Sequence, residues 1–420
     1  MAKSADGVAE PEPAPGVAAG SAASAGAGRS RPDTCSSAIK VLVTGGLGFV
    51  GSAIVRSLQE LHPEWSVWIL DHREDPRHGK EHKNDGYEDD ELDLLRGCAY
   101  EYVQADITDE TEVKKVLAWV RPDAVVHTAG IVPPLSERYS RRLERLVKNV
   151  NVNGTRHVVE AASISGCKAL VYTSSCCAVT DDMTQPYANI DERWPVPEKS
   201  LIYGESKVEA ERIVIAANNP GRIEKTREGD EDSPQYSMST CVLRPSVLFG
   251  EGDNQLIPPI HACIAKQETR YRLGDGTNLW DTTYVGNVAD AHVLAVENLF
   301  SAQPSVRCGG MRRGTAAGET FFIQNNEPIS FREFSLAVWR EFGHYPPPLE
   351  IPIPAGLGWI LGLFAEVITR IYGTTTTLSR GSVMDACAMR YASGDKAREI
   401  LGYRPRVGLE AGIKRGCQVS

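Results

Sequence analysis

The stretch Thr44-Gly45-Gly46-Leu47-Gly48-Phe49-Val50-Gly51 decides the predicted fold of this 420-residue chain. A run rich in β-branched residues, 40–44, precedes it and predicts a buried strand. An apolar pattern of helical period, 50–58, follows it and predicts a helix. The glycines permit a tight turn, let backbone N–H groups approach a phosphate, and allow the helix to pack closely on the strand. All seven residues from Gly45 to Gly51 therefore form a candidate site for the pyrophosphate of a dinucleotide.

The end of the next predicted strand, 67–70, carries a second cofactor signal. Asp71 follows this strand and lies 20 residues after Gly51. A carboxylate at this position accepts hydrogen bonds from the adenosine ribose hydroxyls and repels a 2′-phosphate, so NAD is favoured over NADP. Arg73 is near enough to pair with such a phosphate, which keeps NADP as the alternative.

Strands and helices alternate along most of the chain. Strands are predicted at 40–44, 67–70, 102–105, 124–127, 169–173 and 239–243, and helices at 50–58, 112–120, 149–162 and 206–217. Such alternation is typical of an α/β protein with a Rossmann-like, doubly wound parallel sheet. We expect an NAD-binding Rossmann domain over residues 39–250 and a smaller C-terminal substrate lobe over residues 251–420.

The other segments and the composition limit the classes of partner. Residues 1–38 are rich in Ala, Gly, Ser and Pro and predict a disordered tail, while the charged segments 72–93 and 218–236 predict surface loops. The net charge of −10 argues against a nucleic-acid partner, because phosphate binding needs a positive surface. The ten cysteines, with an adjacent pair at Cys176-Cys177, lack zinc-site spacing, so we expect reduced thiols in an intracellular compartment and no metal.

A Tyr-x-x-x-Lys pair, Tyr203 and Lys207, supplies the candidate chemistry. Four-residue spacing puts both side chains on one face of a helix. An ammonium group beside a phenol stabilises the phenolate, so the pKa of Tyr203 falls and the side chain can move a proton to or from a substrate hydroxyl. Ser175, after the strand 169–173, can hydrogen-bond the reacting oxygen, and Ser174, which faces the opposite way, is the alternative.

Asp106 follows the third predicted strand, with Ile107 beside it. It is placed to contact the adenine amino group of a dinucleotide. The alternative is that its side chain caps the N-terminus of the following helix.

These motifs resemble the extended short-chain dehydrogenase/reductase superfamily over roughly residues 40–300. Within it the chain is similar to the 3β-hydroxysteroid dehydrogenase family, particularly the sterol-4α-carboxylate 3-dehydrogenases (decarboxylating). The stretches that carry the closer match are Val150-Asn151-Val152-Asn153-Gly154-Thr155, Thr173-Ser174-Ser175, Glu192-Arg193-Trp194-Pro195, Leu243-Arg244-Pro245-Ser246-Val247-Leu248-Phe249-Gly250, Trp280-Asp281-Thr282-Thr283-Tyr284-Val285-Gly286-Asn287-Val288-Ala289 and Ala397-Arg398-Glu399-Ile400-Leu401-Gly402-Tyr403-Arg404-Pro405.

The resemblance implies roles for particular residues. It makes Ser175, Tyr203 and Lys207 the catalytic trio, with Tyr203 and Lys207 also contacting the cofactor. It places Thr128, Ala129 and Gly130 in the turn that lines the cofactor, and Pro245 in the same site. The choice of Ser175 over Ser174 rests mainly on this resemblance.

The activity implied by the resemblance is NAD-dependent oxidation of a 3β-hydroxyl on a sterol or steroid-like ring, with loss of carbon dioxide when the ring carries a 4α-carboxyl. Four alternatives stay open: a tailoring dehydrogenase acting on a triterpenoid or meroterpenoid, a nucleotide-sugar epimerase, a reductase of flavonol type, and a non-enzymatic NAD-sensing regulator. A homodimer is also left open.

The segment 351–372 is apolar, although Glu366 and Arg370 interrupt it and argue against a full membrane span. The family's relatives carry an apolar stretch at a similar position. We therefore expect peripheral contact with a membrane, that of the endoplasmic reticulum by the resemblance, with a cytoplasmic location otherwise. The alternative is a buried helix that lines the substrate pocket.

Overall fold

The computed structural model describes residues 38–78, 94–134, 137–181, 185–220, 237–300, 307–308, 311–312, 314–374 and 378–419. The predicted disordered tail, apart from Ala38, lies outside these residues. So do residues 79–93 and 221–236, which make up most of the two predicted surface loops. The described residues from Ala38 onward belong to one compact unit, which contains every element described below.

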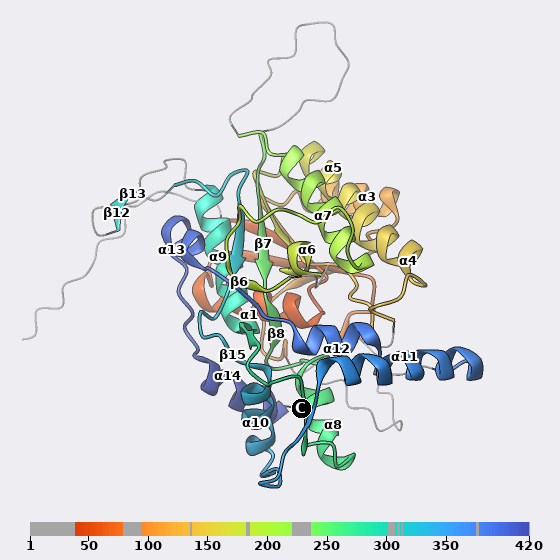
Figure 1. Cartoon of the computed structure of the whole chain (residues 1–420). Coiled ribbons are helices and arrows are strands. Elements are labelled where there is room, and N and C mark those ends of the chain that lie inside the picture. The colour runs from red at the N-terminus through yellow and green to blue at the C-terminus, as the bar shows by residue number, and fades with distance from the viewer. Residues whose placement is uncertain are drawn as a thin grey trace, which may run out of the picture. The chain divides into compact units, whose positions relative to one another are not determined.

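A seven-stranded sheet in the order β14-β7-β5-β4-β1-β2-β3 forms the centre of this unit, and all its pairings are parallel (Figure 1). The predicted Rossmann-like parallel sheet is thus confirmed. Its strands are β1 (Lys40–Thr44), β2 (Ser66–Asp71), β3 (Glu101–Gln104), β4 (Ala124–His127), β5 (Ala169–Thr173), β7 (Ser239–Pro245) and β14 (Thr320–Ile323).

Helices cover both faces of the sheet, because alternate strand residues point to opposite sides. Val41 and Val43 of β1 pack in one hydrophobic cluster with α1 and α9, whereas Leu42 packs in another with α3, α5 and α7. The helices of these two layers are α1 (Phe49–Leu61), α3 (Glu110–Val120), α5 (Thr155–Ile164), α7 (Ile202–Ala216) and α9 (Val285–Phe300).

The predicted helix over 149–162 is interrupted in the structure. Its first part is the π-helix η2 (Asn149–Gly154) and its second part is α5, and the short helix α4 (Glu144–Lys148), which the sequence did not predict, precedes η2. Within η2 the side chain of Asn151 binds the loop after β4. Its amide oxygen accepts from the Ile131 N–H at 2.8 Å, and its amide nitrogen donates to the Ile131 carbonyl at 3.0 Å. Such π segments are frequent at functional sites.

The chain after residue 250 does not stay apart from the main sheet. Its strand β14 pairs with β7, and its helix α9 packs against β5 and β7. The division into a Rossmann domain and a substrate lobe stays a prediction. The edge strand β14 of the main sheet, however, comes from the chain after the predicted boundary at residue 250. Parallel pairing between β7 and β14 is a long-range contact that short sequence patterns do not contain.

The remaining described strands form small sheets, of which the largest has the order β15-β10-β17-β6. They are β6 (Tyr187–Ile190), β8 (Val247–Phe249), β9 (Tyr271–Leu273), β10 (Leu279–Trp280), β11 (Thr282–Tyr284), β12 (Arg307–Cys308), β13 (Met311–Arg312), β15 (Ile329–Ser330), β16 (Ile351–Ile353) and β17 (Arg390–Ala392). The remaining helices are η1 (Pro76–His78), α6 (Cys177–Thr180), α8 (Ile257–Ala265), α10 (Phe331–Glu341), α11 (Ala355–Tyr372), α12 (Arg380–Cys387), α13 (Asp395–Ile400) and α14 (Leu409–Val419).

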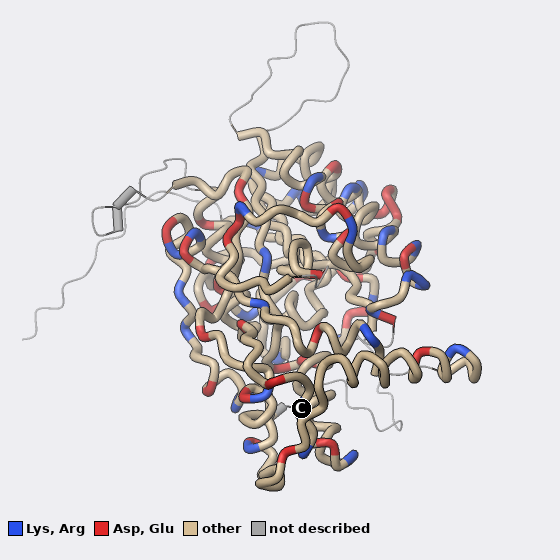
Figure 2. The backbone as a smooth tube through the Cα atoms, viewed as in Figure 1, with Lys and Arg blue, Asp and Glu red and all other residues tan. Residues whose placement is uncertain are grey.

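The apolar segment 351–372 divides into a strand and a helix. Pro352 and Pro354 keep its beginning extended, since a proline disfavours helical geometry in the residue before it. These residues form β16, which pairs with β9, and α11 starts at Ala355. α11 extends along α12 and beyond it, and Figure 2 shows few charged residues on it.

Candidate active site

The glycine turn between β1 and α1 has the close backbone contacts that its sequence predicts. Gly45 has a positive φ of 69°, and its amide donates to the Leu70 carbonyl at 2.7 Å. A Cβ added to Gly51 would lie 2.1 Å from the Gly45 carbonyl oxygen, so only glycine fits there. Gly48, the residue before α1, has no side chain to cap the helix. The turn and the helix N-terminus thus fit a pyrophosphate group.

A cavity of about 1240 Å³ lies at the carboxyl ends of the main-sheet strands. This is the edge at which open α/β sheets bind ligands. The predicted cofactor and catalytic residues that line the cavity are Gly45, Gly48, Phe49, Val50, Gly51, Asp71, Asp106, Ile107, Thr128, Ala129, Gly130, Ser175, Tyr203, Lys207 and Pro245. Gly46 and Leu47 do not line it: Gly46 packs against Ile69, and Leu47 is buried.

Asp71 is buried, with its carboxylate held by several donors. Its oxygens accept from the backbone N–H of Leu47 at 3.1 Å, from the backbone N–H of Arg73 at 3.2 Å and from the Arg73 Nε at 3.1 Å. The sequence left open that Arg73 pairs with a 2′-phosphate. In the structure, the guanidinium of Arg73 pairs with the Asp71 carboxylate. The donors fix Asp71 at the edge of the cavity after β2.

The cap of α3 is Asp109 and not Asp106. The Asp109 carboxylate accepts from the amides of Thr111 at 2.8 Å and Glu112 at 3.0 Å. Asp106 instead accepts from the Thr108 amide at 2.8 Å and lines the cavity. The capping alternative for Asp106 is thus wrong, while its contact with adenine stays a prediction.

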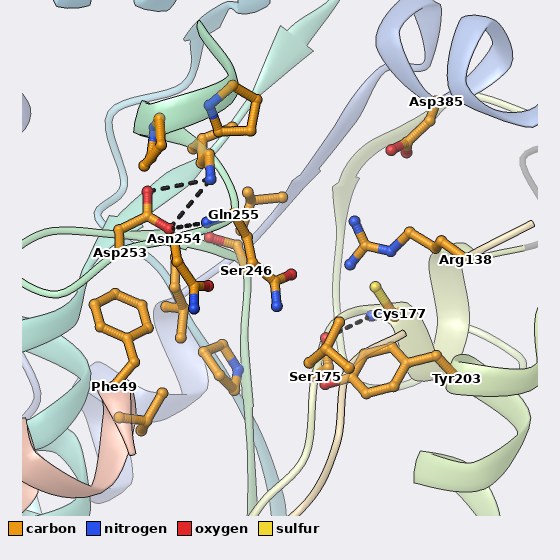
Figure 3. A pocket seen from close by; sticks show the side chains of 18 of the residues that line it. Phe49, Arg138, Ser175, Cys177, Tyr203, Ser246, Asp253, Asn254, Gln255 and Asp385 are labelled. Atoms are coloured by element: carbon orange, nitrogen blue, oxygen red, sulfur yellow. Dashed lines mark hydrogen bonds between the residues drawn. The ribbon is translucent and has the colours of Figure 1, made fainter. Parts of the chain in front are cut away.

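Two adjacent serines after β5 point to different surroundings. Ser174 is buried and donates to the Glu211 carboxylate at 2.5 Å, which also pairs with Arg244. The Ser175 hydroxyl lies in the cavity next to Tyr203 and accepts from the Cys177 amide at 3.2 Å (Figure 3). The geometry therefore brings Ser175, and not Ser174, together with Tyr203.

Tyr203 and Lys207 lie in the first turns of α7 and are almost fully buried. The Lys207 Nζ donates to the Thr173 carbonyl at 2.8 Å and lies 5.8 Å from the centre of the Tyr203 ring. Burial raises the pKa of Tyr203, opposite to the fall that the sequence predicts, and lowers the pKa of Lys207 to about 8. Burial penalises the charged form of both groups, so the ammonium must be close to the phenol for a phenolate to form.

Below the cavity, His127 joins three elements as a neutral ring. Its Nδ1 lies 2.7 Å from the Thr44 hydroxyl and its Nε2 lies 2.9 Å from the Thr155 hydroxyl. Burial, with a smaller contribution from Lys207, lowers the pKa of His127 to about 3. The imidazole therefore links β1, β4 and α5 without adding charge to the site.

The residues around the site that sequence reasoning did not single out come from η2, from the loop before α4, and from α12 and β17. Asn151 donates to the Ser206 hydroxyl at 3.0 Å and so ties η2 to the turn of α7 that carries Tyr203. Arg138, Asp385 and Arg390 also line the cavity. Asn151 lies in the stretch Val150–Thr155 that carries the family resemblance, which was a usable signal, whereas nothing in the local sequence marks the other three.

Comparisons with known proteins agree with this geometry. The sequence model of the 3-beta hydroxysteroid dehydrogenase/isomerase family matches residues 42–353. The chain is 32% identical over 376 residues to a sterol-4-alpha-carboxylate 3-dehydrogenase, decarboxylating, of Saccharomyces cerevisiae, covering 89% of this chain and 96% of the relative. It is 27% identical to the protein of the same name from Mus musculus, covering 91% of each.

Among solved structures, a UDP-glucose 4-epimerase from Thermotoga maritima is similar with a TM-score of 0.61 and 20% identity, covering 91% of this chain and 98% of that one. At this identity the likeness shows the fold alone. The family match and the yeast relative each span most of the chain, so they confirm both the predicted family and the predicted class of enzyme, an oxidoreductase. The chain belongs to the 3-beta hydroxysteroid dehydrogenase/isomerase family.

Proposed function

We propose that the protein is an NAD-dependent dehydrogenase that oxidises the 3β-hydroxyl of a 4α-carboxysterol, with loss of carbon dioxide. The observation that carries the proposal is the meeting of Ser175, Tyr203 and Lys207 in the cavity that also contains the glycine turn. The names of the yeast and mouse relatives, which specify a sterol-4-alpha-carboxylate and decarboxylation, support this substrate class.

The residues of the cavity fit NAD. The turn from Gly45 to Gly51 brings backbone N–H groups and the N-terminus of α1 to the cavity, and a Cβ at Gly51 would clash with the Gly45 backbone and distort this turn. Asp71 offers a fixed carboxylate to ribose hydroxyls and repels a 2′-phosphate, which favours NAD over NADP. When bound, NAD supplies the two-electron acceptor for the carbinol carbon.

Side chains of the protein itself remove the proton of the substrate hydroxyl. Ser175 donates a hydrogen bond that orients the substrate oxygen, and the Tyr203 phenolate removes its proton. The nearby Lys207 ammonium stabilises the phenolate against the cost of burial. Lys207 also keeps its own position through the Thr173 carbonyl.

Decarboxylation needs no further catalytic group. Oxidation at C3 turns a 4α-carboxysterol into a β-keto carboxylate. The bond between C4 and the carboxyl carbon then breaks, carbon dioxide leaves, and the bond's electron pair enters the ketone as an enolate. A proton from water or from Tyr203 converts the enolate to the ketone.

The proposal includes peripheral seating on a membrane through α11. Its side chains Phe364, Ile368 and Ile371 are 62%, 52% and 73% exposed. By length and composition alone this helix is long and apolar enough to cross a membrane. Ile353 and Leu378, which flank α11 in the sequence, line the cavity. A sterol dissolved in a bilayer would then be close to the site.

The test is an assay of NADH formation by the purified protein in detergent, with a 4α-carboxysterol, a simple 3β-hydroxysteroid and UDP-glucose as substrates. Tyr203→Phe should lower kcat with the carboxysterol by at least about 100-fold, because the proton acceptor is lost. Binding of NADH should persist in this variant. The matched control is Tyr345→Phe, whose ring is 73% exposed, and it should match the wild type. Retained turnover in Tyr203→Phe, or turnover of UDP-glucose alone, would overturn the proposal.

A further inference from the structure

Arg138 lies in the loop between β4 and α4 and lines the cavity. Figure 3 shows its guanidinium pointing into the cavity above Ser175 and Tyr203, between Asp385 and Cys177. Phe49, from the glycine turn, lies on the opposite side of the cavity in the same view. The guanidinium is therefore on the side of the proton-handling residues and away from the pyrophosphate site.

The acidic groups near Arg138 are already neutralised or bound by others. Asp385 pairs with Arg390 at 2.6 Å and accepts from the Tyr139 hydroxyl at 2.8 Å. Burial raises the pKa of Asp181 well above its usual range, and its carboxyl accepts from the Gly204 N–H at 3.0 Å. Both carboxyl groups thus have partners other than Arg138, and its guanidinium is left for another anion.

The neighbouring arginines of the same loop each have a carboxylate partner. Arg141 pairs with Glu144 and with Glu205, both at 2.7 Å, and Arg142 pairs with Glu137 at 3.2 Å. Across the parts of the chain that the structure describes, the Arg138 guanidinium has no comparable hydrogen bond or ion pair. A partly buried arginine without an anion is costly unless a ligand supplies one.

We propose that Arg138 binds the carboxylate of the substrate and thereby selects rings that carry a carboxyl group beside the carbinol. The planar guanidinium offers two parallel N–H donors, which match the two oxygens of a carboxylate. Its place above Ser175 and Tyr203 puts that anion next to the carbon whose hydroxyl is oxidised. The inference rests on the proposed function and names a specificity residue for it.

The experiment compares two substrates, a 4α-carboxy-3β-hydroxysterol and the same sterol without the carboxyl. In Arg138→Gln, kcat/KM for the carboxysterol should fall by at least about 30-fold, mainly through KM, because a desolvated charge pair is lost. Turnover of the sterol without the carboxyl should stay within about threefold of the wild type, which also shows that the variant folds. Arg138→Lys should fall between the two, since it keeps the charge and loses the fork.

Arg142→Gln is the matched control, because this arginine is exposed and pairs with Glu137 outside the cavity. It should leave both substrates unchanged. If the wild type oxidises the carboxysterol and Arg138→Gln keeps the same preference for it, the role of Arg138 is overturned while the proposed function stands. If Arg138→Gln loses activity on both sterols equally, Arg138 has a structural role and the inference fails. If the wild type oxidises neither sterol, the proposed function itself fails, and the inference with it.

Discussion

At the scale of single residues, the site keeps a charged group where burial opposes the charge. Lys207 is 4% exposed, and burial lowers its pKa from the ordinary 10.5 to about 8. Between these two values the unfolded chain binds a proton that the folded chain does not bind. The free energy of unfolding must therefore rise with pH through this window and fall again as the pH returns to 8.

This linkage predicts how Lys207→Met differs from the wild type. From pH 8 to pH 10, the free energy of unfolding of the wild type should rise relative to that of the variant by up to about 1.4 kcal/mol per pH unit. Below pH 7 the difference should be constant, because Lys207 is then protonated in both states. Urea unfolding at a series of pH values measures the difference. A difference that does not change between pH 7 and pH 10 would contradict the burial of a titrating lysine.

At the scale of elements, α11 is unusual because its apolar side chains face outward. Only Gly358 and Gly362 of this helix are buried, and they lie against α12: a Cβ on Gly362 would meet the backbone of Ser379 and Arg380 at 2.6–2.8 Å. The Glu366 carboxylate binds Arg380 of α12 at 2.8 Å and so does not point freely outward. The helix thus packs on α12 through its small residues, and its large apolar side chains stay exposed.

Exposure of these side chains predicts weak membrane binding by α11. The double variant Phe364→Gln/Ile371→Gln should lower the partition coefficient onto phospholipid vesicles by at least about tenfold, since each buried apolar side chain contributes about 1.5–3 kcal/mol. Flotation of the purified protein with vesicles measures this. Trp119→Gln is the control, because Trp119 is 67% exposed on α3, and it should not change flotation. Equal flotation of the double variant and the wild type would show that α11 does not contact the bilayer.

At the scale of the whole molecule, the cavity unites residues from Gly45 to Arg390. A ligand that fills such a cavity binds only the folded chain and so stabilises it. NAD at 100 times its dissociation constant should raise the Tm by about 5 °C, and NADP at the same concentration should raise it less, because Asp71 repels the 2′-phosphate.

Gly51→Ala should reduce this shift, because its Cβ cannot fit beside the Gly45 carbonyl. The control is Gly356→Ala, where an added Cβ meets nothing within 4 Å. Differential scanning fluorimetry at several cofactor concentrations measures the effect. A larger shift with NADP than with NAD would reverse the assignment of the cofactor.

The sequence by itself determined the existence of the strands β1 to β5, although not their exact bounds. It also determined the glycine turn and the pairing of Tyr203 with Lys207 on one helix face. These features depend on residues a few positions apart, and local periodicity and spacing record them directly. The family resemblance, too, was readable from short motifs. None of this required knowledge of how distant segments meet.

Only the tertiary structure decided the features that distant segments create. β14 joins the main sheet, Ser174 turns to Glu211 while Ser175 turns to the cavity, and Arg138 comes to lie near Asp385. α11 leaves its apolar side chains outside the fold, although its sequence fits a buried helix equally well. The physical reason is that burial and pairing depend on which surfaces the folded chain brings into contact, and a residue pattern along one segment does not state its neighbours across 100 residues or more.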